Sequence, residues 1–233
     1  MKNYVVIGGS SGIGEAVVTQ LANEGNKVWA TFCAKNISTL STPNVSYHHL
    51  NVMEEDLDLS WMPEVVDGFV YAPGAINLLP FGRLKVDKVN ADFHLQVLGA
   101  VQSLQLAIPH LKRAEQPSVV LYSTVAVQMG FSFHSQVAIA KGAIEGLTRS
   151  LAAEFAPKIR VNAIAPSITN TPLANKFLSS PEKMEANAKR HPMQRVGEAK
   201  DIAEMTVFLL NSTSKWMTGQ IINVDGGITQ IKT

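Results

Sequence analysis

The chain has 233 residues, of which 46% are hydrophobic and 17% are charged, and its formal net charge is +1. This length supports one large core but is short for two full domains. The 20 basic residues are spread along the chain, so the sequence excludes a strongly basic nucleic-acid surface and an acidic tail. The single cysteine, Cys33, excludes an intrachain disulfide and a cysteine-rich metal site.

We expect a soluble protein of the cytoplasm. One free thiol fits a reducing compartment. The apolar run at residues 4–7 is too short for a signal-peptide core, and no uncharged stretch approaches the roughly 20 residues that a membrane helix needs. The histidines show no spacing typical of metal ligands, so the sequence predicts no metal site. Because it has no long apolar stretch, the sequence also predicts no membrane partner.

Short β-type runs alternate along the chain with longer helical ones. The predicted strands are residues 4–7, 27–32, 45–50, 67–72, 118–123, 160–165 and 220–224. The predicted helices are residues 12–23, 86–110, 135–155, 172–190 and 198–211. Runs such as Val119-Val120-Leu121 lack polar alternation, which indicates strands buried on both faces. We therefore predict one α/β domain over residues 1–233, a Rossmann-like, doubly wound parallel sheet in three α/β/α layers.

A glycine-rich segment links the first predicted strand to the first predicted helix. A dinucleotide's pyrophosphate binds the free N–H groups at a helix N-terminus, and it can approach only where side chains are nearly absent. Gly8, Gly12 and Gly14 would provide the turn, the approach and close helix packing, and Ser10 and Ser11 could add hydroxyl donors. An ordinary glycine-rich turn is the alternative, but the strand–turn–helix context favours dinucleotide binding.

The end of the second predicted strand bears on the choice of cofactor. Sites selective for NAD usually place an acidic residue there, which binds the ribose 2′-hydroxyl. Residues 30–35 contain no acid, and Lys35 could meet a 2′-phosphate, although it could equally be a solvated loop lysine. The sequence therefore predicts NADP(H) rather than NAD(H).

With these residues in place, the chain resembles the short-chain dehydrogenase/reductase family along nearly its whole length. The matching segments are the glycine loop 7–14, the pair Asn51-Val52, residues 140–152 of the catalytic-helix region 134–155, the strand 160–166 and the turn 224–227. The resemblance implies hydride transfer between a nicotinamide and an alcohol, a carbonyl or an activated double bond. The protein then positions the substrate and supplies a proton.

The resemblance also implies roles for particular residues. Lys141 would hold the nicotinamide ribose, and Thr171 with the backbone near Ile168 would hold the carboxamide. The implied cofactor-binding residues are Gly8, Ser10, Ser11, Gly12, Ile13, Gly14, Lys35, Asn51, Val52, Ala72, Pro73, Gly74, Lys141, Pro166, Ile168 and Thr171. Residues of about 171–195 would form a substrate lid, and helices 86–110 and 135–155 would pair between subunits of a homodimer or homotetramer.

The positions that relay protons depart from the family pattern. The family's tyrosine, four residues before the lysine, corresponds to Val137, which cannot transfer a proton. The family's serine corresponds to Thr124, whose hydroxyl could still bond a substrate oxygen. The family's helix asparagine falls at Gln96, and Ser167 stands where a glycine is usual.

Three interpretations of this departure remain open. In the first, His134 supplies the proton, because it lies seven residues before Lys141, where the family's enoyl-thioester reductases place tyrosine. The candidate catalytic residues are then Thr124, His134 and Lys141. In the second, a conjugated C=C is reduced to an enolate that hydrogen bonds from Thr124 or from a cofactor hydroxyl stabilise. In the third, the protein is a scaffold that binds the cofactor without catalysis.

Overall fold

The computed structural model describes residues 1–34 and 43–232. Seven strands form one parallel sheet in the order β3-β2-β1-β4-β5-β6-β9. They are β1 (Asn3–Ile7), β2 (Lys27–Phe32), β3 (Val45–His49), β4 (Gly68–Tyr71), β5 (Ser118–Tyr122), β6 (Arg160–Pro166) and β9 (Ile221–Val224). A separate pair joins β7 (Thr169–Asn170) and β8 (Gly197–Glu198). This strand order confirms the predicted Rossmann-like α/β fold.

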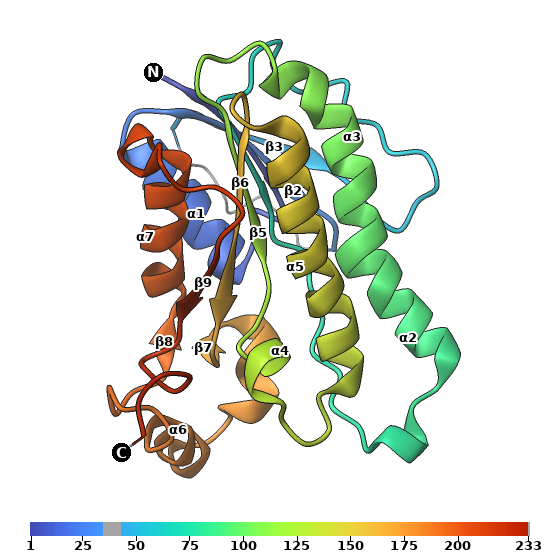
Figure 1. The fold of residues 1–233 in the computed structure, drawn as a ribbon, viewed down its shortest axis with the longest axis vertical. Coiled ribbons are helices and arrows are strands. Elements are labelled where there is room, and N and C mark those ends of the chain that lie inside the picture. Colours follow the sequence, from blue (N-terminus) through green and yellow to red (C-terminus); the bar gives the residue numbers. More distant parts are fainter. Residues whose placement is uncertain (35–42, 233) are drawn as a thin grey trace.

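Helices cover both faces of the sheet, with α1 and α7 on one side and α3 and α5 on the other (Figure 1). The α-helices are α1 (Gly12–Asn23), α2 (Val86–Phe93), α3 (Gly99–Leu111), α4 (Ala126–Met129), α5 (Ser135–Phe155), α6 (Pro181–Ala188) and α7 (Ala199–Leu210). Shorter helical turns are η1 (Phe81–Arg83), η2 (His94–Leu98), η3 (Pro172–Phe177) and η4 (Ser212–Ser214). None of the helices in the described ranges is long and apolar enough to cross a membrane.

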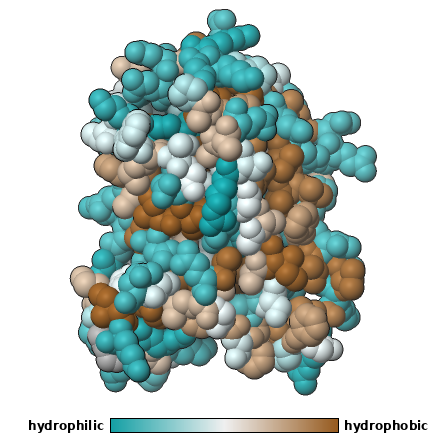
Figure 2. Space-filling model, viewed as in Figure 1, coloured by the Kyte–Doolittle hydropathy of each residue, from teal (hydrophilic) through white to brown (hydrophobic). Residues whose placement is uncertain are grey.

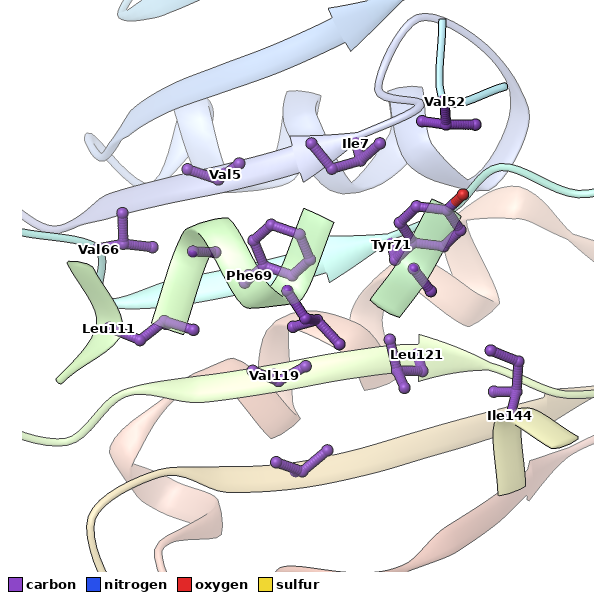
Figure 3. Close-up of a cluster of buried hydrophobic side chains, with 14 of the residues drawn as sticks. Val5, Ile7, Val52, Val66, Phe69, Tyr71, Leu111, Val119, Leu121 and Ile144 are labelled. Carbon is purple, nitrogen blue, oxygen red and sulfur yellow. The ribbon is translucent and has the colours of Figure 1, made fainter. Parts of the chain in front are cut away.

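The central strands β4, β5 and β6 are buried at every residue, as their lack of regular polar alternation predicts. Between the sheet and helices α3 and α5, Phe69, Leu121 and Ile144 belong to one core cluster (Figure 3). Against α1 and α7, a second cluster includes Val18 and Ile202. The two clusters fix the sheet between its helical layers.

Two helices that were predicted as continuous are interrupted in the structure. The helix predicted over residues 86–110 contains a π-helical turn, η2, which separates α2 from α3. The helix predicted over residues 172–190 divides into η3 and α6, because Ser180 caps a new helix whose first residue is Pro181. The short helix α4 was not predicted, whereas the bounds of the seven main strands agree with prediction to within one residue at each end.

The turn between β1 and α1 depends on its glycines. Gly8 and Gly12 have φ values of +78° and +55°, a region that disfavours side chains. A Cβ atom on Gly14 would lie 2.2 Å from the Gly8 carbonyl oxygen. The first turn of α1 therefore contacts the backbone at the end of β1 directly, with no room for a methyl group.

We predict that Gly14→Ala lowers the free energy of unfolding by about 1–3 kcal/mol, because the added methyl must displace backbone. The control is Gly146→Ala in α5, where an added Cβ meets nothing within 4 Å. That change should be neutral or stabilising by up to about 1 kcal/mol. Urea denaturation of both variants measures the difference, and equal stabilities would contradict the tight packing at Gly14.

Candidate active site

A cavity of about 500 Å³ lies at the carboxyl ends of the central strands. Its walls include Gly74 after β4, Thr124 after β5, Ser167 after β6 and Lys141 from α5. The strand order reverses between β1 and β4, and ligands of doubly wound folds bind outside the carboxyl ends at such a reversal. The cavity therefore occupies the position where this fold accommodates a ligand.

The cavity brings together residues that lie far apart in the sequence. The predicted site residues that line it are Ile13, Ala72, Gly74, Thr124, His134, Lys141, Pro166, Ile168 and Thr171. The glycine turn adjoins this wall, since a Cβ on Gly12 would lie 3.4 Å from the Thr171 side chain. Likewise, a Cβ on Gly8 would lie 3.1 Å from Pro73. Predicted residues from both halves of the chain thus meet at one place.

Other predicted cofactor residues lie outside the cavity lining. Asn51 and Val52 follow β3, where Val52 is buried in the core and the Asn51 side chain accepts a hydrogen bond from the Met53 N–H at 3.2 Å. Ser10 is buried in the glycine turn. Lys35, predicted to meet a 2′-phosphate, lies outside the described residues.

The glycine turn has the features that a diphosphate needs. The N–H groups of a helix's first turn have no partner within the helix. Ser11, the N-cap of α1, makes no side-chain capping hydrogen bond. Before the helix, the Gly8 N–H donates a hydrogen bond to Thr31 Oγ1 at 2.8 Å, which fixes the shape of the turn. The exposed positive end of α1 and the absence of side chains fit a dinucleotide.

Lys141 places a cation in the cavity without a counter-charge. Its side chain makes no hydrogen bond or ion pair with any described residue. Burial lowers the pKa of the ammonium group from 10.5 to about 8. Because charges withdrawn from water are normally paired, this partly buried, unpaired ammonium fits a ligand that supplies the missing partner.

Gln96 faces the same part of the cavity from the π-helical turn η2. A Cβ on Gly74 would lie 3.6 Å from Gln96 Oε1 and 3.8 Å from Lys141 Nζ, so both polar ends lie close to Gly74. The Gln96 side chain is buried, and both of its amide atoms lack a hydrogen-bond partner among the described residues. Such a group costs about 1–3 kcal/mol when left unpaired, and π turns are frequent at functional sites.

The cavity holds His134 where it can exchange a proton. His134 is the N-cap of α5, and its Nδ1 lies 2.8 Å from the Ser132 carbonyl oxygen. A carbonyl only accepts, so Nδ1 carries the hydrogen and the Nε2 of a neutral ring is an acceptor. Neutral His134 can therefore act as a base, whereas only its imidazolium form can give up a proton from Nε2. Val137 also lines the cavity and offers no proton.

A hydrogen-bonded pair that the sequence did not predict, Ser167 and the buried His191, also lies in this wall. Ser167 Oγ lies 2.8 Å from His191 Nε2, and His191 Nδ1 donates to the Asn187 carbonyl oxygen at 2.8 Å. Ser167 therefore donates its hydroxyl hydrogen to the ring. The pair joins the segment after β6 to the lid. The only sequence signal was Ser167 in place of the family's glycine, since the partners are 24 residues apart.

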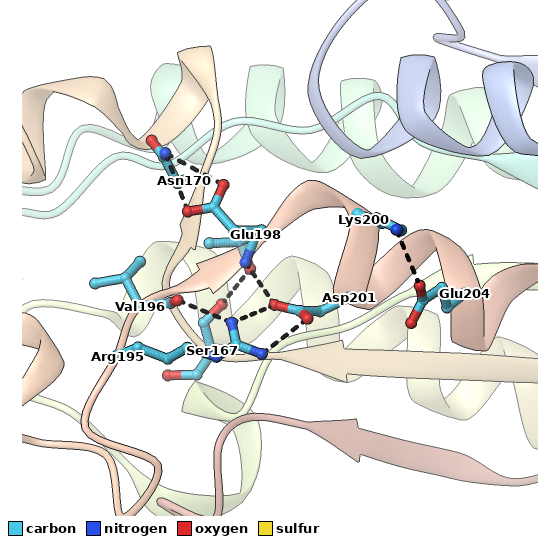
Figure 4. A network of polar contacts seen from close by, with 9 residues as sticks. Ser167, Asn170, Arg195, Val196, Glu198, Lys200, Asp201 and Glu204 are labelled. Atoms are coloured by element: carbon cyan, nitrogen blue, oxygen red, sulfur yellow. Dashed lines mark hydrogen bonds and ion pairs between the residues drawn. The ribbon is translucent and has the colours of Figure 1, made fainter.

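Polar contacts fix the end of residues 171–195, the segment predicted as a lid (Figure 4). Arg195 donates two hydrogen bonds to the Asp201 carboxylate, at 2.5 and 2.8 Å. The same carboxylate accepts a hydrogen bond from the Glu198 N–H at 2.7 Å. The Asn170 amide donates to Glu198 at 3.3 Å and thus links β7 to β8. These contacts attach the end of the segment predicted as a lid to the start of α7.

Comparison with known proteins agrees with this geometry. The sequence family described as "Enoyl-(Acyl carrier protein) reductase" matches residues 8–229. A tropinone reductase homolog of Arabidopsis thaliana is 32% identical over 97% of this chain and 92% of its own length. The 3-oxoacyl-[acyl-carrier-protein] reductase FabG of Thermotoga maritima is 30% identical over 97% of each chain.

Solved structures have the same fold. Ligand-free aldohexose dehydrogenase of Thermoplasma acidophilum has a TM-score of 0.89 at 26% identity, covering 100% of this chain and 96% of its own. NADP-bound ElxO has a TM-score of 0.90 at 26% identity, covering 99% of each chain. The fold and site define a nicotinamide-dependent oxidoreductase. The chain belongs to the short-chain dehydrogenase/reductase family, whose members act on small molecules with NAD(P)(H).

We predict that Lys141→Met stabilises the ligand-free protein at pH 7, by on the order of 2 kcal/mol, because it removes an unpaired, partly buried charge. The folded-state pKa, about 8, lies below the usual 10.5, so the unfolded chain binds this proton more tightly. The penalty from Lys141 is complete below pH 8 and disappears as the pH rises toward 10.5. Urea denaturation between pH 7 and 10 measures the gap between the two proteins, and a gap independent of pH would contradict this account.

Proposed function

We propose that this protein is an NADP(H)-dependent oxidoreductase that transfers hydride between the nicotinamide and a carbonyl or a conjugated C=C, with acyl thioesters among the candidate substrates. The observation that carries the proposal is that Lys141, Thr124 and His134 line one cavity beside the glycine turn. When bound, the cofactor supplies the hydride. The chain's own residues bind and orient the reactants and move the proton.

Lys141 would donate hydrogen bonds to the ribose hydroxyls next to the nicotinamide, which offsets the cost of its burial. Thr171 and the backbone near Ile168 would hold the carboxamide from the opposite wall. Thr124 presents a hydroxyl at the end of β5, where its oxygen accepts a hydrogen bond from the Ala126 N–H at 3.3 Å. The same hydroxyl donates a long hydrogen bond to the Pro166 carbonyl oxygen at 3.5 Å. It would exchange that acceptor for a substrate oxygen or for the enolate formed by C=C reduction.

His134 would transfer the proton that Val137 cannot. Its Nδ1–H is held by Ser132, so the chemistry falls to Nε2. In carbonyl reduction the imidazolium would give the Nε2 proton to the substrate oxygen as hydride reaches carbon. In alcohol oxidation the neutral ring would take that proton back. The two directions therefore require opposite protonation states of one side chain.

Turnover tests the reaction directly. We predict that the protein oxidises NADPH in the presence of at least one member of a panel of ketones, aldehydes and enoyl thioesters. His134→Ala should lower kcat roughly 100-fold, typical for loss of a general acid, while NADPH affinity is kept. Val137→Tyr should raise turnover if the missing tyrosine is the main defect.

Unchanged turnover in His134→Ala would exclude His134 as the proton donor. It would favour reduction of a conjugated C=C, in which Thr124 stabilises the enolate. Background oxidation of NADPH with the whole panel, despite tight binding of the cofactor, would contradict the proposed reaction. The valine at position 137 would then favour a cofactor-binding scaffold.

Cofactor choice has its own test. We predict that NADP(H) binds more tightly than NAD(H), and that Lys35→Ala narrows the difference by roughly tenfold through loss of a contact with the 2′-phosphate. Fluorescence titration with NADPH and NADH measures both dissociation constants. Tighter binding of NADH to the unaltered protein would rule out NADP(H) selectivity.

We also propose that the protein forms a homodimer or homotetramer. Apolar side chains gather on the face formed by α2, α3 and α5 (Figure 2). Leu98, Leu106 and Ile139 are exposed at 44%, 42% and 47%. Exposed apolar patches of this kind mark interaction surfaces, which supports self-association through these helices.

A further inference from the structure

The charged residues that line the cavity are all cations. Besides Lys141, they are Lys176 from η3, Lys183 from α6 and Arg190 from the turn after α6, and no aspartate or glutamate is among the described lining residues. We call Lys176, Lys183 and Arg190 the lid cations. Each is exposed, so it can reach a ligand without a change in the fold.

Neutral groups hold the lid cations in place. Lys176 Nζ donates to the Ile76 carbonyl oxygen at 2.7 Å, and Lys183 Nζ donates to Ser179 Oγ at 3.0 Å. The Arg190 guanidinium stands 5.4 Å from the centre of the Phe131 ring. None of the three makes an ion pair with a described residue. Their positive charge is therefore positioned but not compensated.

Cations elsewhere in and beside the lid are compensated. Lys189, next to Arg190 in the sequence, pairs with Glu185 at 2.6 Å, and Arg195 pairs with Asp201. Lys183 and Arg190 are seven residues apart, and Asn187 between them also lines the cavity. Lys183 and Asn187 are four residues apart and so lie on one face of α6, and Arg190 follows in the turn after it. The segment thus directs its unpaired cations into the cavity and keeps its ion pairs away from it.

Arg190 lies toward the proposed substrate end of the cavity. Arg190 stands over Phe131, whose ring centre is 5.3 Å from that of His134, the proposed proton donor. The diphosphate of the cofactor belongs to a different element, the N-terminus of α1. The charge of the lid is therefore placed for a second anion.

We propose that the substrate carries an anionic group, a carboxylate or a phosphate, which the lid cations bind while its reacting carbon lies near Thr124 and His134. This inference rests on the proposed function. A cavity with one sign of charge focuses the field and raises the local concentration of oppositely charged ligands. A guanidinium adds a planar, two-pronged donor that matches both carboxylate and phosphate.

The test uses substrate pairs that share a reacting ketone and differ in charge. One arm compares 3-, 4- and 5-oxo acids with their methyl esters, and the other compares acetoacetyl phosphopantetheine with acetoacetyl pantetheine. The first arm detects recognition of a carboxylate, and the second arm detects recognition of a phosphate. The variants are Lys183→Glu and Arg190→Glu. The matched control, Lys189→Glu, makes the same change of charge at a neighbouring residue that does not line the cavity.

We expect the unaltered protein to prefer the charged member of at least one pair by roughly tenfold or more in kcat/KM. The preference should disappear in Lys183→Glu and Arg190→Glu, persist in Lys189→Glu, and shrink as salt is added. Equal use of charged and neutral members in both arms, or equal effects of all three variants, would overturn the proposal. Weaker NADPH binding in the two cavity variants would assign these cations to the cofactor and overturn it as well.

Failure of the proposed reaction gives a different result. If no ketone is reduced although NADPH binds, the same pairs are titrated into the NADPH-saturated protein and followed by nicotinamide fluorescence. Tighter binding of the charged members, lost in Lys183→Glu and Arg190→Glu, would uphold the anion site without the reaction. Equal affinities for the charged and neutral members would refute the anion site.

Discussion

The ammonium group of Lys141 is held in the cavity by the packing of α5, and it makes no ion pair with a described residue. Ala140 and Ile144 on either side of it are buried in the core. At the start of α5, the Gln136 amide donates to Asp92 on α2 at 2.5 Å. The helix therefore cannot turn this cation toward solvent without losing its own packing. The lowered pKa of Lys141 reflects a desolvation cost in the ligand-free fold, which a bound ribose would offset.

Uncompensated positive charge extends across the cavity. Positive charge comes from α5 on one wall and from the lid on the other, and the amino end of α1 adds its dipole beside them. The chain as a whole is nearly neutral, with a net charge of +1, so this local excess reflects placement rather than composition. A dinucleotide phosphate and an acidic substrate would each meet complementary charge. Gln96 and Thr124, which are uncharged, would then orient the reacting group between them.

Local sequence patterns predicted much of this arrangement. The glycine turn was predictable because strand, turn and helix follow one another within a few residues, and the buried strands because their apolar runs are continuous. The π-helical turn at Gln96 was not, since one extra residue in a turn leaves the apolar pattern almost unchanged. The Ser167–His191 pair and the inward face of the lid depend on tertiary contacts between distant segments, which no local spacing reveals.

A crystal structure of the protein with NADP⁺ tests the central claim most directly. The account predicts the diphosphate at the N-terminus of α1, the nicotinamide inside the cavity, and its ribose hydroxyls within about 3 Å of Lys141 Nζ. It also predicts that His134 Nε2 faces the space above the reactive carbon of the ring. A dinucleotide bound elsewhere, or a Lys141 side chain that points away from the ribose, would contradict the account.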